Sequence, residues 1–142
     1  MTNYPLTFQT KATAESGIAT RWVIDSMGHQ AECAIPPEFE GPGGAFSPED
    51  LFAQSLTNCF LGTFKVMAEK SKLSFQTIDL NGLLVMDRDD AKRPVMKAFT
   101  LQIKLTSPSD PVRATNLVKK AMEAGFILNS VKTSISYQLE LA

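Results

Sequence analysis

The sequence predicts an α+β fold with antiparallel sheet, and three observations support this prediction. Apolar and polar residues alternate in six segments, as strands do when one face of a sheet is buried. Two further segments repeat apolar residues at helical spacing, and turn or cap residues separate the elements. The order is three strands, a helix, two strands, a helix and a last strand. A length of 142 residues suits a single domain, residues 1–142, with one core.

The N-terminal part is expected to form three strands, over residues 4–14, 18–25 and 30–35. The segment SMGH between the second and third strands supplies turn residues, so these two strands should form a hairpin. Residues 36–44, PPEFEGPGG, are rich in proline and glycine and predict a loop.

The first helix has unusually clear start signals. Ser47 is a good N-cap, Pro48 fits the first helical position, and Asp50 follows the cap as a capping-box variant. We expect the helix to run to about Lys70 or Lys72. Its apolar face is wide, which predicts a largely buried helix.

The C-terminal half should contain strands over residues 74–86 and 95–105, joined by a charged hairpin tip. A second helix is expected over about 111–124, capped by Asp110, with Gly125 as its C′ residue. The segment TSISYQLEL, residues 133–141, predicts a closing strand.

Composition narrows the class of protein. The net charge of -1 does not favour binding to nucleic acid or to anionic membranes. No apolar run approaches the roughly 18 residues of a membrane span, and the N-terminus lacks the pattern of a secretory signal. We therefore expect a soluble, cytoplasmic protein whose two cysteines are reduced.

Several familiar sites do not fit the sequence. The GPGG segment lacks the Lys-Ser/Thr ending of a phosphate-binding loop. One histidine, His29, and two separated cysteines do not assemble a metal site, and no Ser-His-Asp arrangement is evident. We expect neither a metal nor a cofactor.

Cys59 has two interpretations. A free cysteine often packs as a small apolar residue, and Cys59 lies in an apolar helix. Alternatively it is a reactive thiol, which requires a lowered pKa, usually from a neighbouring cation. The positive end of the helix dipole is about 18 Å away and cannot supply this.

Arg21 is the best candidate cation because it sits inside an apolar pattern, although an outward-facing strand arginine is the simpler interpretation. Glu49 lies ten residues before Cys59, about 15 Å along the helix, so the two cannot touch within one helix. Without a second copy of the chain, Glu49 is a first-turn acid favoured by the dipole.

The stretch PPEFEGPGGAFSPEDLFAQSLTNCF resembles the OsmC/Ohr family, the osmotically inducible and organic hydroperoxide resistance proteins. The family pattern is a proline pair, a glycine-rich loop, Ser/Asn-Pro-Glu, an apolar helix and a cysteine. The closing LNSVKTSISYQLEL is also similar to the family.

This resemblance implies an intertwined homodimer, with long central helices enclosed by antiparallel sheets built from both chains. It implies that Cys59 is a peroxidatic thiolate, which Glu49 and an arginine, Arg21 here, hold and activate at the dimer interface. The substrate would be a small organic hydroperoxide, in an apolar pocket that includes Phe52, Leu56 and Phe60 if these are not simply core residues.

The chain departs from the family at the second cysteine, because Gly125 occupies the place of that thiol. Cys33 is the remaining thiol, and packing in a strand is the simpler interpretation of it. An external thiol would then reduce the oxidised Cys59. The sequence thus predicts a thiol-dependent peroxidase, and the alternative is a non-catalytic dimer that binds a small apolar ligand.

Overall fold

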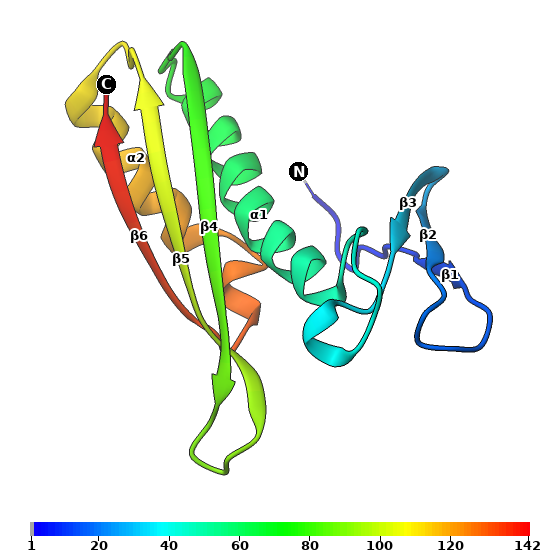
Figure 1. The fold of residues 1–142 in the computed structure, drawn as a ribbon. Helices are drawn as coiled ribbons and strands as arrows, with labels where there is room; N and C mark the ends of the chain where they lie inside the picture. The colour runs from blue at the N-terminus through cyan, green and yellow to red at the C-terminus, as the bar shows by residue number, and fades with distance from the viewer. Residues whose placement is uncertain (1) are drawn as a thin grey trace. The chain divides into compact units, whose positions relative to one another are not determined.

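The computed structural model describes residues 2–142, and the chain divides into two compact units, Met1–Leu51 and Phe52–Ala142. The boundary between the units falls inside the first helix, α1, which spans Pro48–Lys70. Each unit contains one three-stranded sheet (Figure 1). The predicted α+β class is confirmed.

The first unit holds a sheet in the order β1-β2-β3, formed by Lys11–Thr13, Trp22–Ser26 and His29–Cys33. All its neighbours are antiparallel, so the predicted hairpin is confirmed. Met27 and Gly28 both have positive φ, as a tight two-residue turn with the twist of the strands requires. The Asp25 carboxylate accepts the N–H of Gly28 at 2.9 Å and fixes this turn.

Two N-terminal strands are shorter than predicted. Of residues 4–14 only Lys11–Thr13 form a strand, and residues 18–21 precede β2 rather than belong to it. The reason is the register, because Lys11 lies opposite Asp25 and Thr13 opposite Val23, near the two ends of β2. Alternation alone does not make a strand where no partner strand lies opposite.

The loop after β3 leads into α1 through a short 3-10 helix, Pro37–Phe39. The chain then returns to β3, where Ala34 donates to the Phe46 carbonyl at 3.0 Å. Ser47 and Asp50 form the predicted capping box. The Asp50 N–H donates to Ser47 Oγ and the Ser47 N–H to Asp50 Oδ2, both at 3.0 Å.

The second unit holds the sheet β4-β5-β6, formed by Thr77–Arg88, Pro94–Thr106 and Ser134–Leu141. The hairpin β4-β5 is antiparallel as predicted, but β6 pairs with β5 in parallel. The helix α2, Pro111–Ala124, lies between β5 and β6 and carries the chain back along the sheet, so the next strand runs the same way. A 3-10 turn, Leu128–Ser130, follows α2.

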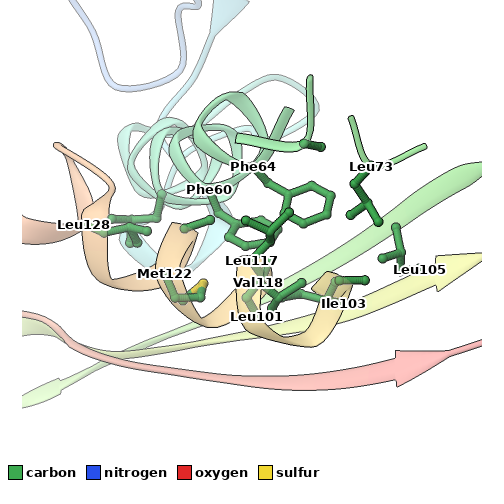
Figure 2. Packing of buried hydrophobic residues seen from close by; sticks show 14 of the residues in the cluster. Phe60, Phe64, Leu73, Leu101, Ile103, Leu105, Leu117, Val118, Met122 and Leu128 are labelled. Carbon is green, nitrogen blue, oxygen red and sulfur yellow. The ribbon is translucent and has the colours of Figure 1, made fainter. Parts of the chain in front are cut away.

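Both α1 and α2 contribute to one core on one face of this sheet (Figure 2). Leu56, Phe60, Phe64 and Ala68 form the buried stripe of α1. They meet alternate residues of β5 and the inner side of α2. The rings of Phe60 and Phe64 stack with centroids 5.7 Å apart. Burying one such side chain stabilises the fold by about 1.5–3 kcal/mol.

The buried face of α1 is narrower than its composition predicts. Val66 is 53 % exposed, and only every fourth position from Leu56 to Ala68 is fully enclosed. Among residues 2–142, no helix combines the length and the apolarity that crossing a bilayer requires.

The close approach of β4 to the core generates a test. A Cβ added at Gly82 would lie 2.6 Å from Phe99 Cζ and 3.0 Å from Thr57 Oγ1. We expect Gly82→Ala to lower the free energy of unfolding by about 1–3 kcal/mol, because a buried ring must move. Urea titration measures this loss. Asn81→Ala, on the opposite face of β4, is the control, and equal stability of both variants would contradict the prediction.

Candidate functional site

Cys59 lies on α1 directly before Phe60, so its sulfur emerges at the edge of the core rather than inside it. The thiol is half-buried. The backbone N–H of Ile127 donates to Cys59 Sγ at 3.3 Å. A sulfur atom accepts such a bond more strongly as thiolate than as thiol. The site therefore offers a partly accessible sulfur that already faces a hydrogen-bond donor.

Gly125 brings the end of α2 against this sulfur. A Cβ added at Gly125 would lie 2.9 Å from Cys59 Sγ and 2.8 Å from Leu128 Cδ1. Gly125 is the C-cap of α2 rather than the predicted C′ residue, and its φ of -63° and ψ of 127° are extended, not the left-handed conformation that is usual for a C′ glycine. Glycine is needed here because a Cβ at this position would collide with the Cys59 sulfur and the Leu128 side chain. The sulfur thus packs against backbone at the position where the family resemblance places a second thiol.

The turn after α2, whose Ile127 N–H contacts the sulfur, carries two exposed apolar residues. Phe126 is 78 % exposed and Ile127 is 43 % exposed. The sequence pattern does not single out either residue as part of the site, and Gly125 before them is the available signal. By contrast, Leu56 and Phe60 are fully buried and Phe52 packs against the core. Those three residues therefore serve the core rather than an open pocket in this unit.

Arg21 holds the glycine-rich loop of the first unit. Its Nε and Nη2 donate to the Gly43 carbonyl at 3.3 and 3.0 Å. A Cβ at Gly44, whose φ is +75°, would lie 2.5 Å from Arg21 Nη2, so the guanidinium packs closely against the loop. Arg21 also pairs with Glu32 at 3.6 Å, an exposed contact that contributes little to stability. The side chain is thus engaged rather than simply pointing into solvent.

Glu49 is half-buried in the first turn of α1, where the dipole favours a carboxylate. Ten positions separate it from Cys59, about 15 Å of helical rise. The first unit carries Arg21 and Glu49, and the second carries Cys59 with its backbone donor.

Cys33 differs sharply from Cys59. It is 1 % exposed in the first unit, and burial raises the pKa of its thiol. A protonated, enclosed thiol is a poor nucleophile, so packing accounts for this residue. Among residues 2–142, no three His, Cys, Asp or Glu side chains gather in a group able to hold a metal ion.

Comparisons with known proteins agree with the sequence resemblance. Residues 41–140 match the family model described as OsmC-like protein. An organic hydroperoxide resistance protein from Xanthomonas axonopodis pv. citri is 29% identical over 135 residues, covering 92% of each chain. An uncharacterised protein from Acinetobacter baylyi is 27% identical over 114 residues, 78% of this chain and 76% of the relative.

Solved structures show the same fold. An OsmC-like protein of unknown function from Vibrio cholerae superposes with a TM-score of 0.85 at 15% identity, covering 96% of this chain and 100% of the other. An organic hydroperoxide resistance protein OsmC from Legionella pneumophila gives a TM-score of 0.73 at 24% identity, over 99% of both chains. The predicted family resemblance and the predicted fold of the single chain are confirmed.

The position of Gly125 generates a second test. A Cβ 2.9 Å from Cys59 Sγ is close enough for a sulfur on it to complete a disulfide with an S–S bond of about 2.05 Å. We therefore expect Gly125→Cys to form an intramolecular disulfide with Cys59 on mild oxidation. Thiol titration of the denatured variant should then detect Cys33 alone.

The matched control is Gly125→Ser, which has a similar volume and no second sulfur. It should retain both native thiols under the same treatment. Three titratable thiols in the oxidised Gly125→Cys variant would show that residue 125 does not face Cys59 in solution.

Proposed function

Since the chain belongs to the OsmC-like protein family, we propose that it is a thiol-dependent peroxidase that reduces organic hydroperoxides through Cys59. The observation that supports this most directly is the setting of Cys59, a half-buried sulfur with a backbone donor. The apolar Phe126 and Ile127 are exposed in the turn that donates this hydrogen bond, and they favour a peroxide with an organic group. The relative from Xanthomonas is named an organic hydroperoxide resistance protein.

The proposed oxidation is a two-electron step. The Cys59 thiolate attacks the distal oxygen of the hydroperoxide, the O–O bond breaks, and the alkoxide takes a proton and leaves as alcohol. The sulfur becomes a sulfenic acid. The N–H of Ile127 keeps the sulfur oriented while it reacts.

An external thiol completes the cycle in this proposal, because residue 125 has no side chain. The first thiol condenses with the sulfenic acid and releases water, which leaves a mixed disulfide. A second thiol displaces Cys59 from it as thiolate. The reducing cytoplasm would supply such thiols, and enclosed Cys33 is not required.

Arg21 and Glu49 complete the proposed site as part of a homodimer. The two residues lie in the first unit and Cys59 in the second, and α1 alone holds Glu49 and Cys59 about 15 Å apart. We propose that the first unit of one copy supplies Arg21 and Glu49 to Cys59 of the other. The guanidinium would then support the thiolate, and the carboxylate would orient the guanidinium.

One observation favours a second candidate function. The exposed Phe126 and Ile127, together with the missing second thiol, also suit a dimer that binds a small apolar ligand without turnover. Such a protein would bind cumene hydroperoxide and cumyl alcohol equally well and would leave Cys59 reduced. Oxidation of Cys59 by the peroxide distinguishes the two functions.

Peroxidase assays on three variants test the proposal. Cumene hydroperoxide consumption, with dithiothreitol as reductant, should fall to background in Cys59→Ser. Arg21→Ala should slow it by about 10²-fold, as expected when one charge-stabilising group is lost. Glu32→Gln is the control, since it removes only the exposed partner of Arg21 and should change the rate little. Full activity of Cys59→Ser would exclude the mechanism.

A mixing experiment tests which copy supplies the arginine. When Cys59→Ser and Arg21→Ala subunits are unfolded together and refolded, heterodimers contain one site with both groups intact if the two copies share the site. Activity should then return to about a quarter of the wild-type value for random pairing. A mixture as inactive as its parents would show that one copy provides both residues.

A further inference from the structure

The structure shows one hydrogen bond to the Cys59 sulfur within the described residues, and the backbone nitrogen of Ile127 donates it at 3.3 Å. Ile127 lies in the turn between α2 and the 3-10 turn Leu128–Ser130, outside any helix or strand ladder. Within the described chain, Cys59 Sγ is the acceptor assigned to this N–H. Gly125 makes this approach possible because no Cβ separates the sulfur from the turn.

From this geometry we propose that oxidised Cys59 forms a sulfenamide with the backbone nitrogen of Ile127. The inference rests on the proposed function, since the hydroperoxide must first convert the thiol to a sulfenic acid. A sulfenic acid condenses either with a thiol or with a backbone nitrogen. Residue 125 offers no thiol and Cys33 is enclosed, so the amide nitrogen is the partner already in place.

The condensation is balanced without any further oxidant. The S–O bond breaks and an S–N bond forms, while the hydroxyl group and the amide proton leave as water. The sulfur keeps the oxidation state that the peroxide produced. An external thiol reverses the bond by attacking the sulfur, and the nitrogen recovers its proton. A second thiol then releases Cys59 from the mixed disulfide.

The turn tolerates this bond because the Ile127 N–H that is lost donates no hydrogen bond within the turn. The hydrogen bonds that hold the turn use carbonyl groups: Asn129 donates to the Gly125 carbonyl and Ser130 to the Ile127 carbonyl, both at 2.9 Å. The exposure of Phe126 and Ile127 leaves room for the nitrogen to close the remaining distance to the sulfur. The sulfenamide would protect Cys59 from irreversible oxidation to sulfinic acid when external thiols are scarce.

Peptide mapping distinguishes this bond from a disulfide. Trypsin places both cysteines in one peptide, Trp22–Lys65, and Ile127 in another, Ala121–Lys132. After one equivalent of cumene hydroperoxide without reductant, we expect these two peptides to be joined, with the loss of two hydrogens. Treatment with dithiothreitol should separate them. A Cys33–Cys59 disulfide would instead lie within the first peptide.

Two variants sharpen the test. Ile127 has a φ of -70°, which suits proline, so Ile127→Pro removes the nitrogen's hydrogen at a compatible backbone angle. It should abolish the cross-link and let dimedone trap the sulfenic acid, whereas Ile127→Ala should still form the cross-link. If the proline variant does not fold, the wild-type map and the alanine variant decide the question.

The possible outcomes distinguish a failure of the sulfenamide proposal from a failure of the proposed peroxidase function. If Cys59 gains one oxygen or a dimedone adduct in the wild-type protein and no cross-link appears, the sulfenamide is wrong and the peroxidase proposal stands. If Cys59 remains reduced after treatment with peroxide, both are wrong. A cross-link that also forms in Ile127→Pro would assign the bond to another nitrogen and overturn the inference.

Discussion

The packing of one stripe of α1 determines where the Cys59 sulfur lies and how far it is exposed. Leu56, Phe60 and Phe64 are fully buried against the sheet and α2, so the helix cannot rotate without exposing large apolar side chains. Cys59 directly precedes Phe60 and is therefore held at the margin of the core. A half-buried sulfur at this position is a consequence of core packing.

The end of α2 supplies the other side of the site, and there a missing side chain matters most. Gly125 lets the backbone approach Cys59, so the sulfur meets a main-chain N–H where a larger residue would place its own atoms. This changes the chemistry available after oxidation. A thiol at residue 125 would favour a disulfide, whereas a glycine leaves the sulfur to backbone nitrogen and to thiols from outside the protein.

The two cysteine thiols differ in accessibility because they lie in different environments. Cys33 is enclosed in the first unit, where burial raises the pKa of its thiol and excludes reactants. Cys59 is partly accessible, and its sulfur accepts a hydrogen bond from the Ile127 N–H. In the first unit, the Arg21 guanidinium already holds the Gly43 carbonyl. Any role of Arg21 at a thiolate must therefore use the donors that this contact leaves free.

Local signals in the sequence determined the helices and hairpins. The Ser47–Asp50 box, Pro48, Pro111 and the turn at Met27–Gly28 act over a few residues, so they predicted the bounds of the helices nearly to the residue and the place of the first hairpin turn. Only the tertiary structure decided the parallel pairing of β6, the short β1, the extended backbone of Gly125 and the contact of Ile127 with Cys59. Each of these depends on residues far apart in the chain, and no local propensity specifies which backbone will lie opposite a given strand or sulfur.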